Sequence, residues 1–141
     1  MLQPSDFVGT WRLERHLDDR SGQMDGDLRG QAVFTEIPSS RLSYAETGTL
    51  ALARGGTLVA ERRYRWQWRD QEVVVFFNDG APFHNFSPKG LVAGSTHLCG
   101  EDTYNVTYDF RGWPHWTATW DVTGPRKNYT SHSAYAPEPL A

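Results

Sequence analysis

The chain has 141 residues, a length that suits one domain with a hydrophobic core of its own. Its net charge is −3, with Lys and Arg scattered among Asp and Glu, so it lacks the basic surface that nucleic-acid binding requires. No apolar stretch reaches the ~20 residues of a membrane span, and the single cysteine, Cys99, excludes a disulfide framework. Because the N-terminus lacks the basic start and apolar stretch of a signal peptide, we expect a cytoplasmic protein.

Apolar and polar residues alternate with a period of two through the first half of the chain, which is typical of strands with one buried face. Turn residues such as Gly55-Gly56 and Arg69-Asp70 separate these runs. Before the first run, Pro4 to Phe7 predicts a single helical turn that could cap one end of the fold. The strands predicted in this half are residues 7–17, 28–34, 42–50, 58–68 and 73–77.

The second half continues the same pattern after a turn at residues 78–82. Its predicted strands are residues 83–86, 95–99, 104–110, 116–122 and 127–135. About ten short strands with short links and no helical periodicity predict an all-β fold, either an antiparallel up-and-down barrel or a sandwich. We expect one domain over residues 1–135 and a flexible, extended tail over the proline-containing residues 136–141.

Aromatic residues make up 13% of the chain, and strand parity places many of them on faces shared with apolar residues. A small barrel either fills its interior with side chains or holds one small ligand. Aromatic walls mixed with a few charged groups favour a ligand pocket, although Arg62 could instead pair with Glu46 inside a filled core. The candidate ligand-binding residues on these inward faces are Tyr44, Glu46, Arg62, Tyr64, Trp66, Tyr104, Tyr108 and Tyr129.

Two histidines complete the set of candidate ligand-binding residues, His84 and His97. His84 follows a tight turn that contains Asp79, and a carboxylate beside an imidazole can orient it as a general base. Alternatively, Asp79 simply caps backbone amides in its own loop. His97 and Cys99 share a strand face, but this spacing is too unspecific to indicate a metal site. We therefore assign no metal and no other cofactor.

The chain resembles a mostly bacterial family of unknown function with a calycin or lipocalin-like β-barrel. The resemblance implies that the first and last strands lie side by side and close a barrel of about eight to ten strands. It also implies that Trp11 plugs one end and that Arg126 stacks on its face as a cation on an aromatic ring. No activity follows from it. The resembling segments are residues 7–12, 44–48, 64–66, 79–80 with 83–84, 97–99 with Asp102 and Tyr104, and 124–129.

Two hypotheses of function follow. In the first, the barrel binds a small amphipathic or aromatic, anionic ligand in its interior. In the second, it is a small metal-independent isomerase, cyclase or hydrolase in which His84 and Asp79 form a general base pair and a pocket tyrosine is the acid. Whether the protein is an enzyme stays open. In both cases the partner is a small molecule rather than nucleic acid or a membrane, and the protein is a monomer or a homodimer.

Overall fold

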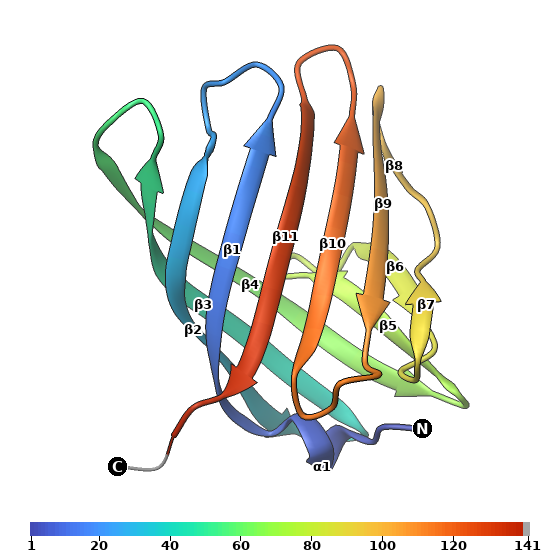
Figure 1. Cartoon of the computed structure of the whole chain (residues 1–141). Helices are drawn as coiled ribbons and strands as arrows, with labels where there is room; N and C mark the ends of the chain where they lie inside the picture. The colour runs from blue at the N-terminus through green and yellow to red at the C-terminus, as the bar shows by residue number, and fades with distance from the viewer. Residues whose placement is uncertain (140–141) are drawn as a thin grey trace.

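Antiparallel strands wind up and down around a common axis in the computed structural model of the chain, which describes residues 1–139 (Figure 1). Over these residues, no helix is both long and apolar enough to cross a membrane. The elements are α1 (Pro4–Phe7), β1 (Gly9–Asp19), β2 (Gly26–Ile37), β3 (Arg41–Leu52), β4 (Thr57–Arg69), β5 (Glu72–Phe77), β6 (Pro82–Phe86), β7 (Leu91–Ala93), β8 (His97–Cys99), β9 (Asp102–Asp109), β10 (Trp116–Thr123) and β11 (Asn128–Pro137).

The strands form one sheet in the order β6-β5-β4-β3-β2-β1-β11-β10-β9-β7, with β8 pairing on β9. The first and last strands, β1 and β11, pair antiparallel over nine residue pairs. At the other side, the link between β7 and β8 bridges β6 and β9. The Gly94 amide donates to the Val106 carbonyl (2.7 Å), and the Ser95 amide donates to the Asn85 carbonyl (2.9 Å). These contacts nearly close the barrel, as predicted.

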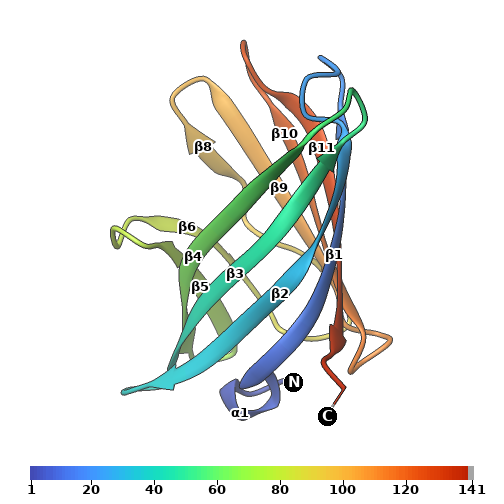
Figure 2. The same ribbon diagram turned by 90° about the vertical axis from the view of Figure 1, so that its left-hand side faces the viewer.

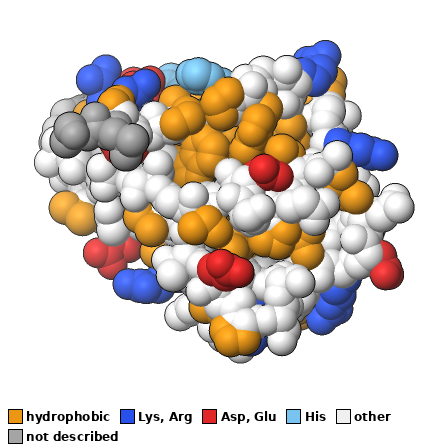
Figure 3. Space-filling view, turned by 90° about the horizontal axis from the view of Figure 1, so that it is seen from below, with side chains coloured by type: hydrophobic (Ala, Val, Ile, Leu, Met, Phe, Trp, Pro, Cys, Tyr) orange, Lys and Arg blue, Asp and Glu red, His pale blue; other side chains and the backbone are white. Residues whose placement is uncertain are grey.

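Phe7 of α1 plugs one end of the barrel, so the predicted helical turn caps this end as expected. Its side chain is fully buried, and the Trp11 indole nitrogen donates to the Phe7 carbonyl at 2.8 Å. Figure 3, which looks onto this end, shows hydrophobic side chains gathered on the face. The centroid of the Phe7 ring lies 5.0–6.5 Å from seven aromatic rings, those of Trp11, Phe34, Trp66, Trp68, Phe110, Trp113 and Trp116.

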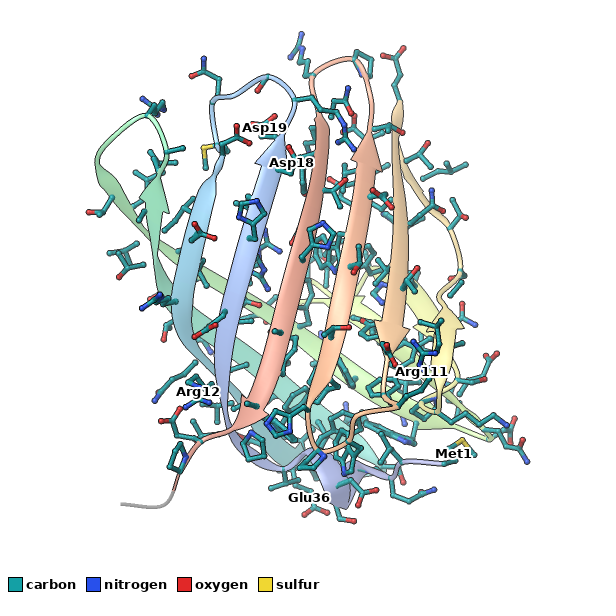
Figure 4. The ribbon with its side chains drawn as sticks, viewed as in Figure 1. Met1, Arg12, Asp18, Asp19, Glu36 and Arg111 are labelled. Carbon is teal, nitrogen blue, oxygen red and sulfur yellow. The ribbon has the colours of Figure 1, made fainter. Side chains whose placement is uncertain are left out.

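The predicted pair of Trp11 and Arg126 is wrong, although β1 and β11 do pair. The antiparallel register sets Trp11 opposite Pro137 and Asp19 opposite Tyr129. Arg126 lies in the exposed loop before β11, at the end of the barrel away from Trp11. Figure 4 shows the two ends of β1, with Arg12 near α1 and Asp19 at the far end.

The last strand is longer than the sequence predicted. β11 includes Ala136 and Pro137, which we assigned to a flexible tail, and Ala136 pairs with Arg12 of β1. Beyond the strand, the Glu138 amide donates to the Thr10 carbonyl at 3.2 Å. The predicted tail therefore does not include residues 136–137, and residues 140–141 lie outside the described part of the chain.

Replacing Phe7 with alanine should lower the free energy of unfolding by about 3–5 kcal/mol, because the substitution empties the centre of the aromatic plug. Val8→Ala, at an adjacent side chain that is 45% exposed, should change it by less than about 1 kcal/mol. Urea denaturation of both variants measures the difference. Equal losses in the two variants would show that the plug does not stabilise the barrel.

Candidate functional site

Burial of the aromatic side chains differs between the two ends of the barrel. Near α1 the inward rings are buried, among them Trp66, Phe110 and Trp116. Toward the opposite end most rings are half-buried around the buried Phe83, and they contact one another, as Tyr64 with Trp120 and Phe77 with His97. We call this second region the mouth. Its half-buried residues are Arg62, Tyr64, Phe77, His97, Tyr104, Trp120 and Tyr129.

A buried ion pair lies below the mouth. Both terminal nitrogens of the Arg15 guanidinium donate to the Glu46 carboxylate, at 2.6 and 2.9 Å, and its Nε donates to the Ser133 hydroxyl at 2.7 Å. The Tyr44 hydroxyl also donates to Glu46 at 2.6 Å and lies 2.8 Å from the Tyr135 hydroxyl. Burial alone would raise the pKa of Glu46, but the hydrogen bonds and charge of Arg15 outweigh it and lower the pKa.

Arg62 does not pair with Glu46, contrary to the filled-core alternative, although the two residues are opposite each other in the β3–β4 register. Its guanidinium carbon instead lies 4.9 Å from the centroid of the Trp120 ring. Because Arg15 already binds Glu46 through both oxygens, Arg62 has no ion-pair partner among the described residues. Within residues 1–139, the buried side-chain atoms without a hydrogen-bond partner are Arg62 Nη1, His84 Nδ1, Trp116 Nε1 and Ser131 Oγ.

His84 faces the interior beside the buried Val75, and a β-bulge turns the preceding residue, Phe83, inward as well. The register between β5 and β6 pairs Val75 with His84 and then Phe76 with Pro82, so Phe83 is an extra residue in β6. Both Phe83 and His84 are consequently buried, where strict alternation would bury one of them. Tyr108 holds the ring, with its hydroxyl 2.8 Å from His84 Nε2.

Gly94 borders the His84 ring on the side of the barrel wall. A Cβ at this position would lie 3.2 Å from the ring carbon Cδ2 of His84, so glycine allows the link to pass close to it. The pKa of His84 is lowered to about 3, mainly by burial and to a smaller extent by the charge of His97. The imidazole is therefore neutral over the ordinary pH range.

The predicted catalytic pair of Asp79 and His84 is not formed. Asp79 is exposed in the β5–β6 loop, and its carboxylate accepts the backbone amide of Ala81 at 2.9 Å. No hydrogen bond joins it to His84 in the described part of the chain. The alternative, that Asp79 caps its own loop, is the arrangement found.

The central cavity holds about 20 Å³, space for about one water molecule. At this level side chains fill the barrel, and a larger ligand must lie nearer the mouth or displace them. Its lining is made by Arg15, Tyr44, Glu46, Tyr64, Trp66, Val75, Phe83, His84, Tyr108, Trp116, Ala118, Trp120 and Tyr135.

The predicted site residues therefore form two levels. Six of them line the central cavity, namely Tyr44, Glu46, Tyr64, Trp66, His84 and Tyr108. Tyr64 also belongs to the mouth, together with Arg62, His97, Tyr104 and Tyr129. At the rim, the Lys127 ammonium donates to the Tyr104 hydroxyl at 2.7 Å. Cys99 is exposed at the end of β8.

Sequence reasoning missed three polar residues of the interior, Arg15, Ser133 and Tyr135. The signal for Arg15 was present, because it occupies an inward position in the alternating run of residues 7–17. Ser133 and Tyr135 likewise alternate inward along β11, in step with Tyr129. Parity shows that such residues face the interior, but it does not show which partner they meet there.

A family model matches residues 7–137, and its description is a family of unknown function, DUF6314. The chain belongs to this family. No curated protein matches it. Among solved structures, it is similar to the S-type phycobiliprotein lyase CPES from Guillardia theta, with 11% identity, a TM-score of 0.74, and 98% of this chain and 92% of that one covered.

A second similar structure is a de novo designed fluorescence-activating β-barrel. It shares 12% identity and a TM-score of 0.54, over 98% of this chain and 100% of the designed one. At these identities the two likenesses extend to the fold alone.

Glu46→Gln should lower the free energy of unfolding by about 3–5 kcal/mol, because it leaves the buried Arg15 without its counter-charge. Glu14→Gln, at an exposed neighbour on β1, should change it by less than about 0.5 kcal/mol. Replacing both partners, as Arg15→Met with Glu46→Leu, should restore part of the loss. Denaturant titration measures all three, and a Glu46→Gln variant as stable as Glu14→Gln would contradict a structural role for the pair.

The pKa of His84, about 3 when folded against 6.5 ordinarily, also predicts how stability depends on pH. The unfolded chain binds this proton below pH 6.5 and the folded chain does not, so stability falls as the pH decreases from 6.5. Between pH 6.5 and about 5 the wild type should lose at least about 1 kcal/mol more than His84→Gln. If the free energy of unfolding fell equally with pH in the wild type and in His84→Gln, His84 would not be held neutral in the folded protein.

Proposed function

We propose that this barrel binds one small aromatic or amphipathic ligand that carries an anionic group, and that Arg62 at the mouth binds the anion. The observation that carries the proposal is the unpaired charge of Arg62. Its Nη1 is buried without a hydrogen-bond partner in the described residues, while Arg15 occupies the Glu46 carboxylate. Two positive charges and one negative charge leave the interior one anion short of neutrality.

Half-buried rings at the mouth supply the apolar part of such a site. The centroid of the Trp120 ring lies 6.4 Å from those of the Tyr64 and Tyr104 rings, and all three side chains remain partly exposed. A flat ligand that covered these faces would bury aromatic surface while its anionic group paired with Arg62. Ser131, which is opposite Trp120 in the β10–β11 register, and His84 offer unpartnered polar atoms to the ligand's other groups.

The comparisons support the proposal at the level of the fold. A barrel of similar shape serves a phycobiliprotein lyase and a designed protein that activates fluorescence. The geometry does not favour the alternative of an Asp79–His84 general base. Asp79 binds the Ala81 amide, and a base with a pKa of about 3 removes protons poorly at neutral pH.

A cytoplasmic location, supported by the lone cysteine, is part of the proposal.

Two dyes that share a ring system test the proposed site. N-phenylnaphthylamine is neutral, and anilinonaphthalene sulfonate carries one negative charge. Both should bind the wild-type protein saturably, and Arg62→Gln should weaken the sulfonate about tenfold while changing the neutral dye by less than about twofold. Fluorescence titration measures both affinities.

The matched control is Arg63→Gln, because Arg63 is the next residue of β4 and faces outward. It should leave both affinities unchanged. Failure of both dyes to bind would contradict a ligand-binding mouth. Equal weakening of both dyes in Arg62→Gln would show that Arg62 supports the fold rather than the anion.

A further inference from the structure

Three arginines cluster on the outer face of the barrel, on β3 and β4, which Figure 2 shows side by side. Because side chains alternate along β4, Arg62 faces the interior while Arg65 and Arg69 face outward. Arg41 of β3 is opposite Gln67, and Phe76 of β5 is opposite Arg65. Together they form a groove of about 210 Å³, here called the arginine groove, lined by Arg41, Arg65, Gln67, Arg69, Phe76 and Gly80.

A neutral group holds each of the three guanidiniums. Arg41 Nε donates to the Pro38 carbonyl at 2.8 Å, and Arg65 Nη2 donates to the Asn78 carbonyl at 3.4 Å. The Arg69 guanidinium carbon lies 5.6 Å from the centroid of the Phe76 ring. These contacts orient the side chains and leave their charges uncompensated.

Carboxylates near the arginine groove have other partners. Glu72 is opposite Arg69 in the register, but its oxygen accepts the Asn85 side-chain amide at 2.9 Å. The Asp79 carboxylate accepts the Ala81 amide. Over residues 1–139, none of the three arginines lies within salt-bridge distance of a carboxylate. Three like charges therefore converge, unpaired, on a protein whose net charge is −3.

The turn after β5 narrows the arginine groove. Gly80 has a φ of 92°, which favours glycine, and a Cβ at this position would lie 3.6 Å from Arg65 Nη2. On the floor, the Gln67 side-chain amide donates to the Ser39 and Trp68 carbonyls at 3.0 and 3.1 Å. The groove therefore has a fixed neutral floor, an aromatic side wall and three cationic donors.

We propose that the arginine groove binds the phosphoryl group of a small phosphate ester, with the ester's organic part against Phe76. A phosphoryl group carries up to two negative charges and three terminal oxygens, so it can accept hydrogen bonds from all three guanidiniums. A carboxylate has one charge and two oxygens in a plane, and a single arginine satisfies it. The site is independent of the mouth, because it lies on the other face of the β4 strand.

Titration of the full chain with phenyl phosphate, followed by calorimetry or by backbone amide NMR shifts, tests the proposal. Phenyl phosphate should bind saturably and at least about tenfold tighter than benzoate, which offers the same ring with a carboxylate. Arg65→Gln and Arg69→Gln should each weaken phenyl phosphate about tenfold. Both side chains reach the surface, so the variants should keep the wild-type unfolding midpoint.

Two further variants locate the binding. Arg62→Gln removes the anion site proposed at the mouth, so phenyl phosphate should still bind saturably to Arg62→Gln, and adding Arg65→Gln to that variant should weaken the remaining binding about tenfold. Arg63→Gln removes an outward arginine of the same strand that does not line the groove, and it should leave the affinity within about twofold of the wild type. The proposal is overturned if phenyl phosphate does not saturate in Arg62→Gln, if benzoate binds that variant equally well, or if Arg63→Gln weakens binding as much as Arg65→Gln.

Discussion

The ion pair of Arg15 and Glu46 determines how the interior of this barrel is organised. It joins β1 to β3 on the inner face of the sheet, over the intervening β2, and Ser133 adds β11 to the same network. Burying two ions is costly unless their hydrogen bonds are nearly complete, and here both carboxylate oxygens and three guanidinium nitrogens have partners. Because Glu46 is fully engaged, the second interior arginine has nothing left to bind within the described chain.

The pair also separates two regions of different character. Between it and α1, aromatic rings are packed around Phe7 with little exposed surface. On its other side, aromatic rings of similar chemistry keep part of their surface exposed. The same residue types therefore stabilise the fold at one end and form the candidate site at the other, and the position of one charged pair decides which role each ring has.

Strand parity predicted the fold well, because a period of two is a local property of the chain. It failed where the answer depends on distant pairing. The alternative pairing of Arg62 with Glu46 was open from the sequence, whereas the partner of Glu46 is Arg15 of β1, two strands away in the sheet. The bulge that turns Phe83 inward beside His84 leaves no trace in the alternation. The pair of Trp11 and Arg126 was implied by the family resemblance and not by parity, and the antiparallel register puts these residues at opposite ends.

The barrel is closed by many hydrogen bonds on one side and by few on the other. β1 and β11 are joined along nine residue pairs, while β6 meets the link after β7 through two hydrogen bonds between Asn85 and Ser95. Each such bond contributes about 1 kcal/mol net, so this seam should separate at far lower cost than the β1–β11 ladder. We therefore expect local opening of the native barrel to begin at this seam, in the part of the wall that lies beside His84.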